Sequence, residues 1–221
     1  MLAASQRQKL DDTNDALFYS MPRFVIHVDE RFIEQLTDLY RERLQPNSCI
    51  LDMMSSWVSH LPTEMEFAQV DGHGMNAEEL AKNPQLDNYF VQNLNEDQIL
   101  PYGDCTFDAV LNTVSVQYLQ HPETVFAEIY RILKPGGIAI VSFSNRMFYH
   151  KAIAAWRDGS DASHIALVKR YFASVQGFGQ PEVIANQGPP INPILQMIGM
   201  AGSDPFYAVV AERMEVLVNG E

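Results

Sequence analysis

The chain has 221 residues, of which 47% are hydrophobic, so it is long and apolar enough to bury the core of one α/β domain. Acidic residues outnumber basic residues by 28 to 15, and a surface with a net charge of −13 repels phosphate backbones, so no nucleic acid partner is expected. The N-terminus lacks an apolar signal region, and no apolar run reaches about 18 residues, so we expect a cytoplasmic protein without membrane contact.

An N-terminal arm and helix, over residues 1–45, precede the first predicted strand. Residues 1–16 are polar, and we expect them to be mobile. The apolar, aromatic run 17–28 leads to a predicted helix over 29–44, where apolar residues recur at helical spacing and Asp29 is a suitable N-cap. The arm either packs as an extra layer or caps a ligand site as a lid.

From residue 49 onward the sequence alternates predicted strands and helices. Strands are expected at 49–53, 65–70, 88–92, 107–116, 138–143, 182–185 and 206–211. Helices are expected at 56–61, after Asn76, after Pro122, near 150–157, over 160–174 and after Asn192. Five βα units followed by two strands indicate an α/β, doubly wound sheet with helices on both faces. Ligands of such sheets bind beyond the carboxyl ends of the strands, where the strand order reverses.

The segment CILDMMSSWVSH, residues 49–60, reads as a short apolar strand that ends in an acid and enters a loop. Nucleotide-binding α/β folds begin in this way, but with glycines in the loop. Here Met54, Trp57 and Val58 stand in place of glycines, which supply positive φ and let a ligand approach the backbone. Function therefore depends on whether this loop still holds a nucleotide-like cofactor.

The stretch from Leu94 to Phe143 carries the most specific pattern in the chain. It contains the turn LPYGD, the strand start TFD, a long apolar strand, and a helix that ends in RILKPGG before the next strand. This pattern resembles class I S-adenosylmethionine-dependent methyltransferases of the methyltransferase-11-like, small-molecule type. The resemblance implies one Rossmann-like domain over 1–221, with seven strands of which the last is antiparallel. It also implies S-adenosylmethionine as cofactor and methyl transfer to a small molecule.

In this family the loop after the first strand receives the methionine carboxylate of the cofactor. By resemblance, Asp52 matches the acid of this motif, while Ser55 and Ser56 offer hydroxyl and N–H donors. An acid after the second strand takes the ribose, and a polar residue after the third strand meets the adenine. The other residues that we assign to the cofactor on this basis are Trp57, His73, Met75, Asn93, Leu94, Asn112 and Ser115.

Two alignments of the second strand stay open for the ribose. Asp71 follows Asp52 by 19 residues and could accept the ribose hydroxyls. Alternatively, Gly72 matches a family glycine, which places Gly74 at the position of the acid and removes that acceptor. The loss of one hydrogen bond to a charged acceptor weakens binding by roughly ten- to a hundredfold.

Substrate contacts are predicted at Tyr19, Tyr118 and Arg146, although Arg146 alternatively pairs with a surface acid. Methyl transfer to a hydroxyl or amine needs a proton acceptor and no metal, and no metal-ligand spacing occurs. The candidate acceptors, which spacing does not distinguish, are His27, Tyr118, His121 and His150.

Two functions therefore stay open. The first is an active small-molecule methyltransferase with a glycine-poor cofactor loop. The second is a catalytically silent methyltransferase-like protein that binds a metabolite or a protein partner. A nicotinamide-dependent oxidoreductase is disfavoured, because no G-x-G-x-x-G motif opens a helix. The sequence leaves the oligomeric state open.

Overall fold

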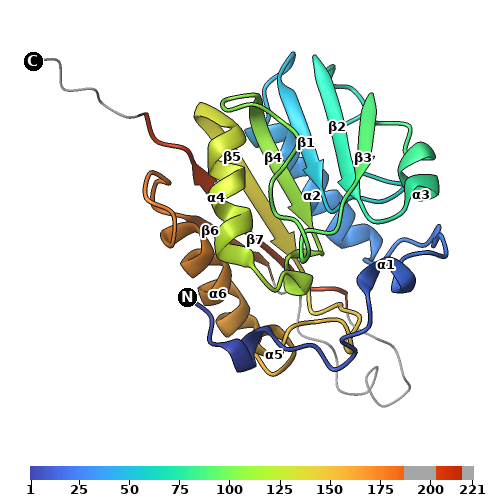
Figure 1. Cartoon of the computed structure of the whole chain (residues 1–221). Coiled ribbons are helices and arrows are strands. Elements are labelled where there is room, and N and C mark those ends of the chain that lie inside the picture. Colours follow the sequence, from blue (N-terminus) through green and yellow to red (C-terminus); the bar gives the residue numbers. More distant parts are fainter. Residues whose placement is uncertain (187–202, 216–221) are drawn as a thin grey trace, which may run out of the picture.

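The computed structural model describes residues 1–186 and 203–215 (Figure 1). Its strands are β1 Cys49–Met53, β2 Gln69–Gly74, β3 Asn88–Val91, β4 Phe107–Thr113, β5 Leu133–Phe143, β6 Glu182–Asn186 and β7 Phe206–Glu212. They form one seven-stranded sheet in the order β3-β2-β1-β4-β5-β7-β6. The last strand, β7, is antiparallel to both of its neighbours, and the other adjacent pairs are parallel. The expected doubly wound sheet with an antiparallel last strand is confirmed.

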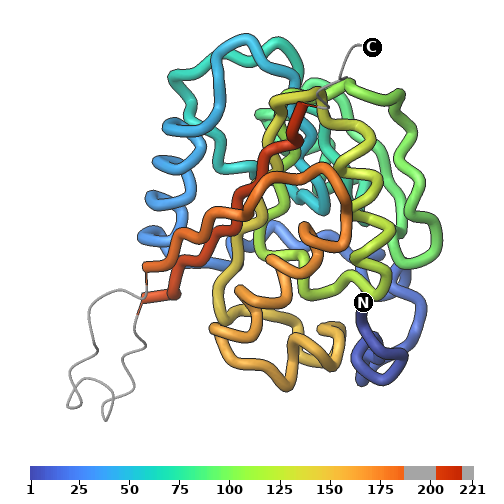
Figure 2. The backbone as a smooth tube through the Cα atoms, turned by 90° about the vertical axis from the view of Figure 1, so that its left-hand side faces the viewer, coloured from blue at the N-terminus to red at the C-terminus, as the bar shows by residue number. Residues whose placement is uncertain are grey.

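Helices cover both faces of this sheet, as expected. The helices are η1 Ala4–Arg7, α1 Asp15–Phe18, α2 Glu30–Arg43, α3 Ala77–Ala81, η2 Val116–Tyr118, α4 Pro122–Ile132, α5 Ala154–Arg157 and α6 Asp161–Ala173. Figure 2 shows α2 on one side of the sheet and α4 and α6 on the other. Successive strand residues point to opposite faces, so Ile50 joins the buried cluster under α2, whereas Leu51 joins the cluster under α4 and α6.

The helix starts follow the capping residues in the sequence. Asp29 accepts a hydrogen bond from the Phe32 N–H at the start of α2, as expected. Asn76 caps α3 in the same way, and Pro122 occupies the first turn of α4. These caps satisfy backbone N–H groups that a helix start leaves without partners.

The family-like pattern around β4 has a structural role. The Arg131 guanidinium donates to the carbonyls of Leu100 and Tyr102, at 3.2 and 2.8 Å, and so holds the turn before β4. The Lys134 ammonium pairs with Asp108 at 2.8 Å and ties the start of β5 to the start of β4. These residues build the sheet and do not line the pocket described below.

Three expectations between β1 and β6 are wrong in detail. Residues 56–61 form no helix, because the chain is non-helical there, with φ of 57° at both Met54 and His60. The second strand lies at 69–74, later than expected, because the loop continues past Pro62. β5 begins at Leu133, so the KPGG turn lies inside this strand as an irregularity. The helix expected after Asn192 falls outside the described residues.

The N-terminal segment 1–16 was expected to be mobile, and the structure shows it packed. Leu2 is buried in the core, and its N–H donates to Glu123 at 2.7 Å. Arg7 makes a bidentate ion pair with the same carboxylate, at 2.9 Å for both bonds. Long-range pairing of polar side chains therefore orders a segment whose composition resembles a mobile tail.

A buried charge cluster holds the next part of the arm. The Lys151 side chain is 1% exposed, and its Nζ lies 3.1 Å from Asp11 Oδ2 and 3.4 Å from Asp15 Oδ1. It also donates to the Thr13 carbonyl at 2.8 Å, while Lys9 Nζ pairs with Asp15 Oδ2 at 2.6 Å. Burial lowers the pKa of Lys9, and the carboxylates of Asp15 and Asp11 oppose that shift.

Replacing Lys151 by Met should release the arm. The substitution removes one of the two lysines that pair with the buried Asp15 carboxylate, and it also removes the partner of the partly exposed Asp11. The free energy of unfolding should therefore fall by about 3 kcal/mol. Amide exchange of residues 9–15, measured by mass spectrometry, should rise. Lys169→Met, at an exposed position of α6, is the matched control and should change neither quantity. Unchanged exchange in Lys151→Met would show that the cluster does not anchor the arm.

Candidate functional site

A pocket of about 370 Å³ lies at the carboxyl ends of the strands, under the N-terminal arm. β1 contributes Asp52, β2 contributes Gly74 and β4 contributes Thr113, while the arm contributes Tyr19 and His27. The strand order reverses between β1 and β4, so the pocket sits at the switch point where doubly wound sheets bind ligands. Its volume falls in the range of about 300–1,000 Å³ that small-molecule sites show.

His73 fastens the loop after β1 to the neighbouring strand. Its Nδ1 accepts the Met54 N–H at 3.1 Å, its backbone carbonyl accepts the Ser55 N–H at 2.7 Å, and its Nε2 donates to the Gln92 carbonyl at 2.9 Å. Burial lowers the pKa of His73 to about 4, so the ring is neutral at pH 7. His73 is buried, and its ring is a structural tie that also lines the pocket.

Asp52 orders the first turn of the same loop from inside the protein. Its Oδ2 accepts the Ser55 hydroxyl at 2.5 Å. Burial raises the pKa of Asp52 to about 6, and hydrogen bonds from Ser55 and Ser59 oppose that rise. The carboxyl group therefore titrates near neutral pH and is bound to the loop rather than free in the pocket.

Gly74, at the end of β2, is the residue that one of the two open alignments places at the position of the family's acid. A Cβ atom on Gly74 would lie 2.5 Å from the Ser55 carbonyl oxygen, so the close approach of loop and strand requires glycine here. Asp71, the alternative acceptor, is not among the pocket-lining residues. Its carboxylate accepts hydrogen bonds from Tyr102 at 2.9 Å and from Asn88 at 3.1 Å.

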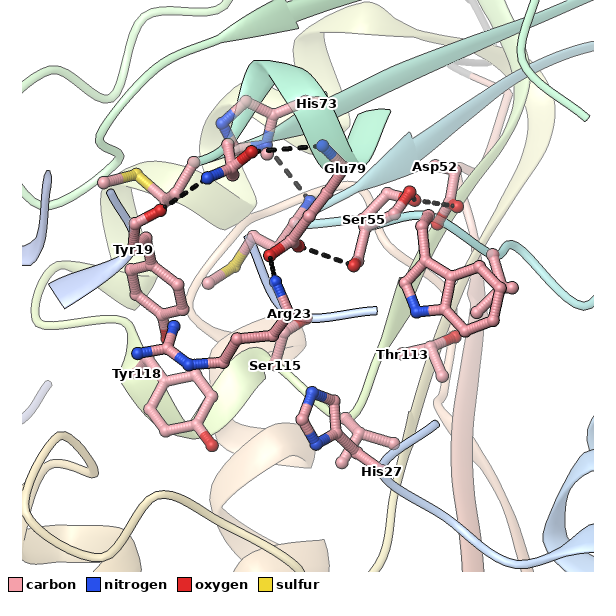
Figure 3. Close-up of a pocket in the computed structure, with 18 of the residues that line it drawn as sticks. Tyr19, Arg23, His27, Asp52, Ser55, His73, Glu79, Thr113, Ser115 and Tyr118 are labelled. Carbon is pink, nitrogen blue, oxygen red and sulfur yellow. Dashed lines mark hydrogen bonds between the residues drawn. The ribbon is translucent and has the colours of Figure 1, made fainter. Parts of the chain in front are cut away.

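Glu79 links the β1 loop to the arm across the pocket. Its Oε2 accepts the Ser56 hydroxyl at 2.7 Å, and its Oε1 accepts the Arg23 N–H at 2.6 Å (Figure 3). Glu79 is 8% exposed and projects from the first turn of α3. Sequence analysis missed Glu79 and Arg23 as site residues, because the contact joins positions 56 residues apart and no local motif marks it.

Trp57 lines the pocket wall and turns toward the arm. Its indole N–H donates to the Val25 carbonyl at 3.3 Å, and its ring meets Phe24 edge to face with centroids 6.2 Å apart. The bulky residue at a glycine position of the family pattern is therefore part of the contact between loop and arm.

Aromatic side chains form the opposite side of the pocket. Phe148, after β5, stacks on Tyr118 at 6.0 Å and meets His27 edge to face at 5.3 Å. The Tyr118 hydroxyl accepts the Phe148 N–H at 2.8 Å, and burial raises the pKa of Tyr118. Burial likewise raises the pKa of Tyr19. Both phenols therefore stay protonated at pH 7.

The structure brings most of the predicted site residues together. Three lie outside the pocket lining: Asp71, Gly72, which packs against Leu86, and Asn112, which donates to the Met53 carbonyl at 3.3 Å within the sheet. The predicted residues that line the pocket are Tyr19, Asp52, Ser55, Ser56, Trp57, His73, Gly74, Met75, Asn93, Leu94, Ser115, Tyr118 and Arg146.

Arg146 pairs with an acid, which is one of the two roles that the sequence left open, while its contact with substrate stays a prediction. It lines the pocket, and its Nε donates to Asp204 Oδ1 at 2.7 Å. The acid is 5% exposed, so the pair is partly buried rather than a pure surface contact. Across 1–186 and 203–215, no group of three or more His, Cys, Asp or Glu side chains could hold a metal ion. No helix within these ranges is long and apolar enough to cross a membrane.

The Methyltransferase domain family matches residues 52–141, from the end of β1 through β2, β3 and β4 and most of β5. Residues 52–141 belong to the class I S-adenosylmethionine-dependent methyltransferases. The cofactor of this family is S-adenosylmethionine. The matched residues supply the strand ends of the pocket, whereas the arm lies outside the match.

Two curated relatives match only parts of the chain. Over 72 residues it is 32% identical to the biotin biosynthesis bifunctional protein BioHC of Teredinibacter turnerae, covering 33% of this chain and 13% of that protein. Over 75 residues it is 31% identical to a malonyl-acyl-carrier protein O-methyltransferase of Marinomonas sp., covering 34% of this chain and 27% of that protein. The chain thus spans less than a third of either relative.

Solved structures share the methyltransferase fold over most of the chain. The complex of the Haloferax volcanii Trm112 methyltransferase activator with a methyltransferase matches with a TM-score of 0.61 and 15% identity, covering 84% of this chain and 92% of that one. The cyclase SpnF matches with a TM-score of 0.57 and 18% identity, covering 83% of this chain and 81% of that one. At these identities the likeness shows the fold alone.

Replacing Asp52 by Asn tests the electrostatics of the loop. The folded-state pKa of about 6 exceeds the ordinary value of 3.8, so the folded protein binds this proton more tightly than the unfolded chain. Asp52 therefore costs stability as pH rises from about 4 to 6. The free energy of unfolding of Asp52→Asn minus that of the wild type, from urea denaturation, should increase over this window by roughly 2–3 kcal/mol and then stay constant. A pH-independent difference would contradict the raised pKa.

Proposed function

We propose that this chain binds S-adenosylmethionine in the pocket and transfers its methyl group to a small molecule. The observation that carries the proposal is the position of the pocket, at the β1–β4 switch point of a methyltransferase domain and enclosed by the arm. Polar groups from the strand ends line one side, and aromatic groups from the arm and from the loop after β5 line the other. Such a two-sided pocket suits a polar cofactor beside an organic acceptor.

The residues of the pocket fit an adenosyl cofactor. Ser115 Oγ is buried without a hydrogen-bond partner and lines the pocket, so a polar ligand would satisfy it. Ser55 and Ser56 would hold the methionine end, and Asn93 and Leu94 would hold the adenine. The bound cofactor supplies a methyl group on a sulfonium. Gly74 offers no carboxylate to the ribose, so binding should be roughly ten- to a hundredfold weaker than with an acid there.

Of the four candidate acceptors, His27 is the one that the position of the pocket favours. His121 and His150 do not line the pocket, and the phenol of Tyr118 is protonated at pH 7. His27 stands at the pocket rim beside Phe148, and its ring nitrogens have no hydrogen-bond partner among the described residues. Partial burial lowers the pKa of His27, with Glu79 opposing and Arg23 reinforcing that shift. Its imidazole is neutral at pH 7 and able to take a proton.

Binding of S-adenosylhomocysteine, the demethylated cofactor, tests the proposal first. Calorimetric titration up to millimolar ligand should give heat, and the melting temperature should rise with ligand concentration. Ser56→Trp places a large ring at the pocket-lining Ser56 and should abolish binding. Thr63→Trp, at an exposed position of the same connection, should bind as the wild type does. Absence of heat and of a thermal shift in the wild type would refute the enzyme assignment.

His27→Gln tests the catalytic role separately from binding. The variant should keep its affinity for S-adenosylhomocysteine, while kcat for methyl transfer to a hydroxyl or amine acceptor falls by roughly 10²- to 10⁴-fold. His150→Gln, exposed and outside the pocket lining, should leave kcat unchanged. Titration of His27 followed by NMR should give a pKa below 6.5 in the wild type. An unchanged kcat in His27→Gln would assign the proton to another group.

One observation favours a second candidate, a catalytically silent protein that binds a metabolite or a partner. The ribose acceptor is missing at Gly74, and both carboxylate oxygens of Glu79 already accept hydrogen bonds from the loop and the arm. A fold of this kind does not by itself establish methyl transfer, and the structurally similar SpnF is described as a cyclase. Failure to bind S-adenosylhomocysteine together with stoichiometric co-purification of a partner would favour this alternative.

A further inference from the structure

Arg23 carries a charge that the described residues do not balance. Its guanidinium carbon lies 4.4 Å from the ring centre of Phe18 and 5.6 Å from that of Phe148. Nη2 donates to the Phe18 carbonyl at 2.8 Å. Nη1 is buried and has no hydrogen-bond partner. A guanidinium has five N–H donors, so most of its hydrogen-bonding capacity is unused here.

Other buried or pocket-lining cations of the arm region have carboxylate partners. Arg146 pairs with Asp204, and Lys151 pairs with Asp11 and Asp15. Within 1–186 and 203–215, no ion pair reaches the Arg23 guanidinium. A partly buried charge without a counter-ion is costly, and a well-placed anion offsets part of that cost.

The nearest acid in the pocket is committed elsewhere. Glu79 accepts the backbone N–H of Arg23 through Oε1 and the Ser56 hydroxyl through Oε2, so it holds the arm in place without pairing with the side chain (Figure 3). Figure 3 shows the guanidinium beside Tyr19 and Tyr118, in the aromatic part of the pocket. The protein thus fixes the backbone of Arg23, and Arg23 lines the pocket without a carboxylate on its guanidinium.

We propose that Arg23 is the binding site for a carboxylate of the ligand in this pocket. The inference rests on the proposed function, because it concerns the ligands of the same pocket. The planar fork of a guanidinium binds a carboxylate through two parallel hydrogen bonds, and the surrounding rings limit the access of water that would weaken them. The carboxylate belongs either to the methionine end of the cofactor or to the methyl acceptor, and the chemistry of recognition is the same.

The test compares ligands that differ in one carboxylate. S-adenosylhomocysteine carries the amino-acid end, and methylthioadenosine lacks it. Benzoate and benzamide form a second pair, chosen because aromatic rings surround Arg23, and are titrated into protein saturated with S-adenosylhomocysteine. The variants are Arg23→Gln, Arg23→Lys as a charge-retaining comparison, and Arg170→Gln, an exposed position outside the pocket lining, as the control for loss of one surface charge.

Two results support the inference and identify the source of the carboxylate. If the carboxylate is that of the cofactor, Arg23→Gln weakens the binding of S-adenosylhomocysteine roughly ten- to a hundredfold and leaves the affinity for methylthioadenosine unchanged. If the carboxylate is that of the acceptor, Arg23→Gln leaves the affinities for both nucleosides unchanged. In this case benzoate gives a thermal shift in the wild type, benzamide gives none, and Arg23→Gln abolishes the benzoate shift. In either case Arg23→Lys keeps part of the carboxylate-dependent binding, and Arg170→Gln binds as the wild type does.

The opposite result overturns the inference without touching the proposed function. If Arg23→Gln is folded by its melting transition and binds every probe as the wild type does, Arg23 is not a carboxylate site. If the wild type binds neither nucleoside, the proposed function fails instead. Benzoate, titrated into the protein without nucleoside, then decides the inference, since a thermal shift that is lost in Arg23→Gln supports a carboxylate site and any other result overturns it.

Discussion

The tie between the β1 loop and the end of β2 is the contact on which the pocket depends. Two consecutive N–H groups, of Met54 and Ser55, donate to the side chain and the backbone carbonyl of His73. This pairing holds Met54 at φ 57°, a conformation that glycine adopts without strain and methionine seldom adopts. Gly74 permits the approach from the other side. The position that requires glycine is thus on the neighbouring strand, at Gly74, while the loop itself carries methionine at a positive φ.

The loop and the arm are built as one unit around that tie. Glu79 accepts from Ser56 of the loop and from Arg23 of the arm, and Trp57 donates to Val25. The buried lysine cluster then fixes the start of the arm to the segment after β5. A ligand between loop and arm would contact both, so opening the arm would expose the cofactor side and the acceptor side together. Trp57, a bulky residue of this loop, makes part of the contact with the arm.

The fold could be predicted from sequence because its signals are local. The apolar strands and the caps at Asp29 and Asn76 each act within a short span of chain. The site could be predicted only in part. Contacts between distant segments decide the rest. The Arg23 N–H donates to Glu79 across 56 residues of sequence, and the Lys151 ammonium donates to the Thr13 carbonyl across 138 residues. A polar N-terminus and a glycine-poor loop therefore look irregular in sequence although tertiary hydrogen bonds order both.

The most direct test of the central claim, that the glycine-poor loop leaves room for an adenosyl ligand, is a crystal structure of the protein grown with S-adenosylhomocysteine. Ligand density is predicted between the ends of β1, β2 and β4 and the arm. The Trp57 indole should stay against Phe24 and Val25, and the tie between Met54 and His73 should be intact. An indole that occupies the pocket, with no ligand density beside it, would contradict the claim and leave only the fold.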